Sequence, residues 1–475
     1  MSLNSLPFLA CLPVLWIIFR LVNPSARWMV LLLFSLLFIG VYRPWALLVV
    51  CEASFFTFYA ARLLNGKQYR KLILLSALGI QILALLLLKY VESADSGLRF
   101  LFRESGFRTD TVFYTLGFSF YTLQHIGYLL DVYYKRIPAE SHPLRFLLFS
   151  AYFAKFNAGP LEQPAELIPQ FKMPNPIRDD ISAGFQRIVL GLFKKMVLAD
   201  HLAPVEERIF NGTAHPGSLA IITGVILFTI QLYFDFSAYC DLAIGVSRMF
   251  GIRLTENFLF PFSSESISVF WRTWHITLIK WFTTYIYYPL VYTFRKSGRV
   301  AVICGIACTF LLSGIWHGIG YTFLVWSLLH ALYLSFESLS KHTRVAWSGR
   351  FTGWGYKWLS MLITFMLVCF SNLFFRAENW TQAIQLLKGS GGSLFGREGI
   401  VKGYLSPLAG GGYQEALFNL GLVMTLSFAF LVLEKGICKR INSPKLYSFQ
   451  LFILLFLILF VGVFQKTDSF IYLQF

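Results

Sequence analysis

Long apolar segments, separated by short polar loops, occupy most of the chain. A helix that crosses a lipid bilayer needs roughly 20 consecutive, mostly apolar residues. The pattern therefore predicts an all-α, polytopic integral membrane protein with about 11–12 transmembrane helices. Segment 218–250 is longer than one straight crossing requires. The candidate segments are 7–22, 28–43, 45–62, 72–90, 111–134, 218–250, 268–293, 299–316, 320–338, 357–376, 414–434 and 447–465.

Residues 144–200 break this pattern. Their apolar pieces, 146–156 and 188–199, are too short to cross a bilayer, and prolines are frequent between them. Irregular backbone at membrane depth is tolerated only where protein or a water-filled cavity surrounds it. We expect re-entrant or interfacial helices here, on the cytoplasmic face, with a plain cytoplasmic loop as the alternative.

The chain shows no internal repeat and no separate polar domain at the level of its sequence. We therefore expect a single domain that spans residues 1–475. N-terminal helices would occupy 1–143, the re-entrant segment 144–200, a core with most of the unusual polar residues 218–340, and C-terminal helices 357–475.

The composition supports the membrane interpretation and narrows the function. Hydrophobic residues make up 56% of the chain and charged residues 14%, whereas an ordinary soluble domain is about 25% charged. The net charge of +17 would suggest nucleic acid in a soluble protein. Here no basic stripe alternates with aromatic residues in the way that single-strand binding requires. We therefore expect the lipid bilayer, and no nucleic acid, as the partner of this chain.

The basic residues predict an orientation. Basic clusters follow every odd-numbered apolar segment, and cytoplasmic loops carry an excess of Lys and Arg. An even number of crossings then places both termini outside the cytoplasm. The glycine-rich stretch 389–413 becomes the longest external loop. The basic clusters lie at 20–27, 62–71, 135–145, 295–299, 341–350 and 435–445.

Two aspartates interrupt the apolar segment 218–250. Ionisable residues inside a span are costly and are therefore functional candidates. Asp235 and Tyr239 are four residues apart, so they share a helical face and can form a hydrogen bond. The alternative is that these groups only join helices together.

A second polar group lies around Trp271, Arg272, Trp274 and His275. The spacing predicts that the two tryptophans and the histidine share one helical face. Polar groups with apolar walls are typical of a small-molecule site. The alternative is an aromatic belt at the membrane interface.

The third group is a histidine between glycines, in the order Trp316, His317, Gly318. Glycines allow close approach of a ligand or another backbone, and histidine can take up and return a proton near neutral pH. His330 could form a hydrogen bond within the bundle. No carboxylate lies at helix spacing from His275 and His317, so we expect no metal site.

Several of these segments resemble the membrane-bound O-acyltransferase family, in particular its bacterial AlgI-like branch. The sequence departs from the family pattern at Ala238, Cys240 and Thr273 and lacks a Gly-Gly-Asn-Arg motif after Leu290. The segments that carry the resemblance are Phe120–Leu123, Asp131–Tyr133, Ala158–Pro160, Pro169–Phe171, Tyr233–Gly245, Glu256-Asn257-Phe258, Phe270–His275, Trp316-His317-Gly318, Phe374–Ala377 and Phe470–Phe475.

The resemblance implies acyl transfer through a central tunnel. His317 would be the general base, and His275 would orient the acceptor or stabilise the oxyanion. Lys194 and Lys195 would bind phosphates of the donor at the cytoplasmic mouth. The remaining candidates for the tunnel wall are Trp271, Arg272, Trp274, Trp316, Asp235, Tyr239 and Asn257.

The same resemblance implies the reaction and its setting. The protein would lie in a bacterial inner membrane and move an acetyl group to a cell-envelope polysaccharide such as alginate. Acetyl-CoA or an acyl carrier would be the cytoplasmic donor, with no bound cofactor. A periplasmic acetyltransferase of the SGNH or AlgX/AlgJ type would receive the group.

Two other functions remain open at this point. A DltB-like enzyme would transfer D-alanine from a carrier protein toward teichoic acid or a related polymer. A transporter or flippase would use the same buried polar residues as a permeation path, although transporters often show repeated halves.

Overall fold

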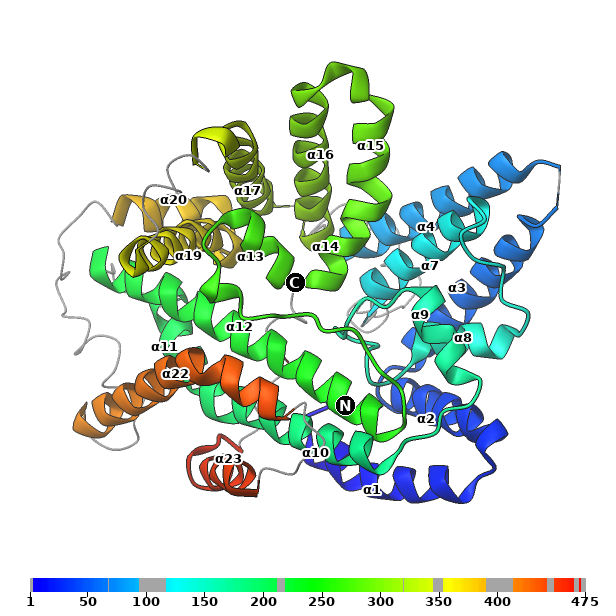
Figure 1. Cartoon of the computed structure of the whole chain (residues 1–475), viewed down its shortest axis with the longest axis horizontal. Helices are drawn as coiled ribbons and strands as arrows, with labels where there is room; N and C mark the ends of the chain where they lie inside the picture. Colours follow the sequence, from blue (N-terminus) through cyan, green and yellow to red (C-terminus); the bar gives the residue numbers. More distant parts are fainter. Residues whose placement is uncertain are drawn as a thin grey trace, which may run out of the picture. The chain divides into compact units, whose positions relative to one another are not determined.

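The computed structural model describes residues 3–66, 68–93, 117–211, 218–318, 320–344, 353–389, 413–441, 448–464 and 470. These residues are helical or irregular, and the only β-type pairing among them is an isolated bridge between Phe258 and Trp274. The all-α prediction is confirmed (Figure 1). The longer helices are α1 (Leu6–Leu21), α2 (Arg27–Tyr42), α3 (Pro44–Leu63), α4 (Arg70–Ser93), α7 (Phe118–Tyr133), α8 (Pro143–Ala151), α10 (Arg178–Phe193), α11 (Asp200–Asn211), α12 (Ser218–Met249), α16 (Arg299–His317), α17 (Tyr321–Leu339), α19 (Trp354–Arg376), α20 (Trp380–Gly389), α22 (Tyr413–Ile441) and α23 (Ser448–Val461).

Eight helices in the described residues are long and apolar enough to cross a membrane, which confirms a polytopic membrane protein. Two further apolar helices, α1 and α23, are shorter, with 16 and 14 residues. The predicted segment 218–250 is a single helix of 32 residues, α12. The eight candidate spans are Pro24–Val41, Pro44–Leu63, Arg70–Leu87, Ser218–Met249, Arg299–His317, Tyr321–Leu339, Trp354–Arg376 and Gly421–Arg440.

The prediction of one span over 268–293 is wrong at its start. Helix α13 (Ile267–Thr273) ends at Thr273, and a new helical run begins with α14 (Ile276–Phe282). That run continues through a π-helix at Thr283–Tyr287 and α15 (Tyr288–Thr293). The break consists of two residues with non-helical backbone, Trp274 and His275.

The chain divides into two compact units. Unit 1 comprises 1–188, 239–256 and 444–446, and unit 2 comprises the rest, so each includes part of α10 and α12. In unit 1, α3 packs against α2, α4, α7 and α8. The expectation of one domain with four segments stays a prediction.

Residues 144–200 form short elements, as expected from their broken apolar pattern. After α8 the backbone is irregular from 152 to 163, and the side chains at 152–162 are buried. A short helix α9 (Pro164–Leu167) and a 3-10 turn at Ile168–Phe171 lead to α10. Whether this segment is re-entrant, and on which side the termini lie, stay predictions. Most of the expected external loop, 390–412, lies outside the described residues.

Unit 2 holds the helices that matter for the site. α17 packs between α16 and α19, and the short helix α13 contacts both α17 and α19 (Figure 1). A π-helix at Lys194–Ala199 joins α10 to α11 and contacts α22 and α23. Such π-helical turns are rare and often occur at functional sites.

Candidate active site

A small cavity lies inside unit 2, and three histidines line it. His275 comes from the break between α13 and α14, His317 from the end of α16, and His330 from α17. The rest of the wall is mostly aromatic and aliphatic, and includes Trp271, Trp274 and Trp326. A largely apolar cavity with a few converging polar groups is the usual form of a small-molecule site.

The helix break presents His275 to the cavity. The φ angle of His275 is +46°, a left-handed conformation that is uncommon for residues other than glycine. A short pairing with residues 257–259 holds it: Leu259 N donates to Thr273 O at 2.9 Å and Ile276 N to Asn257 O at 3.0 Å. Strained backbone of this kind persists where its surroundings fix it, and it clusters at active sites.

Asn257 fixes which nitrogen of His275 carries the proton. Its Oδ1 accepts from the backbone N–H of Thr277 at 3.1 Å and from the Thr277 hydroxyl at 2.9 Å, and it lies 3.2 Å from His275 Nδ1. Since a backbone N–H can only donate, the amide atom that faces it must be the oxygen. His275 Nδ1 therefore carries the hydrogen, and Nε2 keeps its lone pair.

His275 lies outside the eight candidate spans, and it is 2% exposed. Burial lowers the pKa of His275 to about 3, so the imidazole is neutral at physiological pH. A neutral ring with Nδ1–H donated to Asn257 can accept a hydrogen bond at Nε2, but it cannot donate one there.

His317 ends α16 where two glycines permit close packing. A Cβ on Gly314 would lie 2.7 Å from Ser327 Oγ, and one on Gly318 would lie 2.4 Å from the Phe323 ring. Side chains at these positions would therefore push α17 away from α16. The glycines bring Trp326 of α17 to the His317 ring, at a centroid distance of 5.3 Å.

The His317 ring has aromatic rings around it. Trp316 and Phe375 lie 4.8 Å and 5.2 Å from it by ring centroids. Trp316 is buried beside His317, although it is not among the residues that line the cavity.

The structure places His330 in the same cavity. The sequence alone predicted only that His330 forms a hydrogen bond within the helix bundle. Trp271 Nε1 donates to His330 Nδ1 at 3.2 Å. Trp326, Ser313, Asn372 and Phe375 also line the cavity and were not predicted. The spacing of Trp326 and His330, one helical turn apart on α17, was the sequence signal that could have identified them.

Only some of the other residues predicted for the tunnel wall line the cavity. Trp271, Trp274 and His275 line the cavity, but the prediction that they share one helical face is wrong, because α13 ends between them. Arg272 is exposed on α13. Tyr239 is buried and belongs to unit 1, and its bond to Asp235 stays a prediction.

A second buried polar cluster, which we call the charged network, surrounds the π-helix of unit 2. Lys195 Nζ lies 2.6 Å from Asp235 Oδ1 and 2.8 Å from Asp200 Oδ1. The carboxylates outweigh the effect of burial, which alone would lower the pKa of Lys195, and raise it above its usual value. Asp235 is thus one of the ion-pair partners of a lysine.

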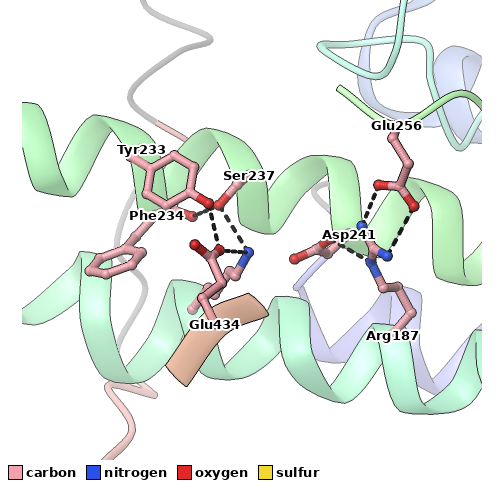
Figure 2. Close-up of polar contacts among 8 residues, drawn as sticks. Arg187, Tyr233, Phe234, Ser237, Asp241, Glu256 and Glu434 are labelled. Atoms are coloured by element: carbon pink, nitrogen blue, oxygen red, sulfur yellow. Dashed lines mark hydrogen bonds and ion pairs between the residues drawn. The ribbon is translucent and has the colours of Figure 1, made fainter. Parts of the chain in front are cut away.

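Lys194 belongs to the same network. Its Nζ lies 3.2 Å from Glu434 Oε1 of α22 and 3.4 Å from Ser237 Oγ. Figure 2 shows Tyr233 of α12 directed toward Glu434, to which its hydroxyl donates at 2.5 Å. Lys194 and Lys195 are only 3% and 4% exposed. Both ammonium groups are thus buried and paired with carboxylates, and their binding of donor phosphates stays a prediction.

Figure 2 also shows a separate ion-pair group in unit 1. Arg187 Nε lies 2.6 Å from Asp241 Oδ1, and its other two nitrogens contact both carboxylate oxygens of Glu256 at 3.1 Å and 2.6 Å. A bidentate Arg–carboxylate pair is among the stronger charged hydrogen bonds. The separate bond from Arg187 Nε accounts for Asp241, the second aspartate of α12.

Within the described residues, no group of three or more His, Cys, Asp or Glu side chains could hold a metal ion. The three histidines of the cavity instead bond to an amide or an indole, or pack against aromatic rings. These contacts suit neutral imidazoles that exchange protons or hydrogen bonds with a substrate.

Comparisons with known proteins agree with the resemblance drawn from the motifs. A model of the membrane-bound O-acyltransferase family matches residues 134–375, a range that contains all three histidines. A peptidoglycan O-acetyltransferase of Helicobacter pylori is 32% identical over 397 residues, which cover 77% of this chain and 74% of that protein.

Two further relatives bear on the branch of the family. A probable alginate O-acetylase AlgI of Pseudomonas aeruginosa is 32% identical, over 78% of this chain and 70% of that protein. A teichoic acid D-alanyltransferase of Bacillus subtilis is 27% identical, over 55% of this chain and 69% of that protein. The predicted family and enzyme class are confirmed: the chain belongs to the membrane-bound O-acyltransferase family and is a multi-pass O-acyltransferase.

Proposed function

We propose that this protein moves an acetyl group from a cytoplasmic thioester donor across the membrane for O-acetylation of a cell-envelope polysaccharide. The single observation that carries the proposal is the cavity in which His275 and His317 meet behind apolar walls. Two relatives named as O-acetylating enzymes, one for peptidoglycan and one for alginate, support acetyl as the transferred group.

In the proposed reaction His317 is the general base. An alcohol is a poor nucleophile until its proton is removed, and a positioned histidine can remove it. The acceptor oxygen then attacks the acyl carbonyl carbon, and the thiolate leaves with a proton returned by the imidazolium. The apolar wall formed by Trp326 and Phe375 excludes water, which would otherwise hydrolyse the donor.

His275 orients the acceptor in this proposal. Its Nε2 lone pair, defined by the bond between Nδ1–H and Asn257, can accept a hydrogen bond from the acceptor hydroxyl. Of the two roles considered for His275 from the sequence, the tautomer supports orientation of the acceptor and does not support stabilisation of an oxyanion. Trp271 and Trp274 supply apolar contact area for the substrates.

The donor and the partner complete the proposal. Acetyl-CoA would be the donor from the cytoplasmic side of a bacterial inner membrane, and an extracytoplasmic acetyltransferase of the SGNH or AlgX/AlgJ type would receive the group. Both termini would lie outside the cytoplasm. Alginate and peptidoglycan are the two acceptor classes that the relatives suggest.

Radiolabelled donors test this function on the purified protein. Acetyl-CoA, an acetylated carrier protein and a D-alanylated carrier protein are supplied separately, and release or transfer of label is measured. The proposal expects turnover of acetyl-CoA. Turnover of the D-alanylated carrier alone would indicate the DltB-like alternative, and no covalent change with any donor would favour a transporter.

A further inference from the structure

His330 is a buried histidine that the proposed reaction has not yet used. It lies on α17, is 1% exposed and lines the cavity with His275 and His317. The indole N–H of Trp271 donates to its Nδ1 at 3.2 Å. Since an indole nitrogen can only donate, Nδ1 must be the accepting nitrogen, and in the neutral ring the hydrogen sits on Nε2.

Aromatic rings fix the plane of the His330 imidazole. Phe310 stacks on it with an interplanar angle of 27° and a centroid distance of 6.0 Å. The Trp271 and Trp326 rings meet it edge-on at 4.9 Å and 5.1 Å. The Nε2–H group is therefore an oriented donor in a low-dielectric site, where a hydrogen bond to a developing charge is stronger than in water.

The tautomers of His275 and His330 are opposite. His275 carries its hydrogen on Nδ1 and offers an acceptor at Nε2, whereas His330 carries its hydrogen on Nε2 and offers a donor there. Acyl transfer requires a donor for the carbonyl oxygen, which becomes negatively charged when the acceptor attacks. Of these two rings, only His330 has the hydrogen in the position that this role needs.

We propose that His330 is a further catalytic residue, whose Nε2–H stabilises the oxyanion formed during acyl transfer, and that Trp271 positions it. This assignment rests on the proposed function. The acceptor O–H proton goes to His317, the new O–C bond forms, and the carbonyl π electrons move to the oxygen that His330 contacts. The oxyanion then collapses, the C–S bond breaks, and the thiolate takes the proton from His317. The products are the acetate ester and the free thiol, and His330 neither gains nor loses a proton.

Three variants of the full-length protein test the assignment. His330→Phe keeps an aromatic ring but removes the donor, and His330→Gln keeps an N–H donor of similar reach. The matched control is His125→Phe, because His125 is another fully buried histidine, bonded to Ser150 at 2.8 Å in unit 1. Transfer of labelled acetyl from acetyl-CoA is measured as kcat and KM, together with the thermal unfolding midpoint.

The loss should appear in kcat. Removal of one oxyanion donor lowers kcat by about 10²–10³-fold, so His330→Phe should show this loss with KM within about threefold of wild type. His330→Gln should keep kcat within about tenfold, and His125→Phe should leave kcat unchanged. Folded His330→Phe with more than about a third of the wild-type kcat overturns the assignment. So does His330→Gln if it is as impaired as His330→Phe.

A second measurement does not depend on turnover. The nitrogen-15 spectrum of histidine-labelled protein is compared between wild type and His330→Gln, and the signal lost from the eight histidines belongs to residue 330. A neutral ring with hydrogen on Nε2 supports the donor role, and hydrogen on Nδ1 overturns it. If the wild-type protein turns over no donor but the His330 tautomer is as expected, the proposed function is wrong. In that case the hydrogen position assigned to His330 is still correct.

Discussion

The cavity and the charged network both belong to unit 2 and both bury polar groups, yet those groups differ in their chemistry. Imidazole, indole and amide groups line the cavity, and hydrogen bonds join His275 to Asn257 and Trp271 to His330. The charged network pairs two ammonium groups with carboxylates from α11, α12 and α22. Ionised groups are therefore buried here against one another, whereas neutral donors and acceptors line the cavity.

The physical reason is the cost of burial. Removing an ion from water costs several kcal/mol even after relaxation, and a partner charge must offset that cost. A neutral imidazole has a much smaller desolvation cost and can still exchange a proton. We therefore expect variants of the charged network to lower stability, and variants of the cavity to lower turnover.

The largest stability effect should come from Lys195→Met. The substitution leaves Asp235 and Asp200 buried without the ammonium group that lies between them. Breaking a buried pair in this way costs about 3–5 kcal/mol of unfolding free energy. Thermal and denaturant unfolding in detergent measure it, with Lys296→Met, an exposed lysine, as the control. A loss below about 1 kcal/mol would show that the network does not stabilise the fold.

Asn257→Ala should lower turnover, because it changes a contact of a cavity histidine. It removes the acceptor that fixes the His275 tautomer and holds Thr277. A misplacement of about 1 Å in a catalytic group can cost about 10²-fold in rate, and we expect a loss of that order in acetyl transfer. Asn257→Asp, which keeps the acceptor oxygen, should retain more activity. Equal activity in wild type and Asn257→Ala would contradict the role of this contact.

Tyr233→Phe is a smaller change, at a residue that contacts both the charged network and a tryptophan of the cavity. The Tyr233 hydroxyl donates to Glu434, while its ring packs against Phe258 and Trp274 at centroid distances of 5.7 Å and 6.1 Å. The variant loses the hydrogen bond but keeps the ring. We expect a loss of about 1–3 kcal/mol in stability and turnover within about threefold of wild type. A large loss of turnover with unchanged stability would instead assign the hydroxyl to the chemistry.

The smallest effect should come from Arg272→Gln. Arg272 is exposed on α13 and is not among the cavity-lining residues, although the motif suggested a place in the wall. Exposed substitutions away from special features usually change stability by about 0.5 kcal/mol or less. Turnover should stay within about twofold, and a loss above about tenfold would show that the side chain reaches a substrate.

Much of the fold could be predicted from the sequence because membrane helices are encoded locally. A run of apolar residues specifies a span whatever lies elsewhere in the chain. The predicted segment 299–316 differs by one residue from α16, and 218–250 differs by one residue from α12. The break at Trp274 and His275 could not be predicted in the same way, because residues 257–259 hold it by pairing with 273–276.

Part of the site could also be predicted, because several of its residues belong to local sequence motifs. Local motifs identified His275, His317 and Asn257 as candidates, and the structure places the two histidines in one cavity, with Asn257 bonded to His275. The partners of Lys195 and His330 come from distant parts of the chain: Asp235 on α12 and Trp271 on α13. A single sequence without tertiary contacts cannot identify such pairs. The sequence alone therefore indicates neither the carboxylate partners of Lys195 nor the contact between Trp271 and His330.

Acetyl transfer by His317→Ala, measured together with the thermal unfolding midpoint, tests whether this cavity is the site of acyl transfer. Removal of a general base typically costs about 10²–10⁴-fold in rate. We predict a loss in this range with the midpoint near that of wild type, a lesser loss for His275→Ala, and little change for His342→Ala, an exposed histidine. A folded His317→Ala protein that keeps more than about a tenth of the wild-type rate would contradict the claim that this cavity is the site of acyl transfer.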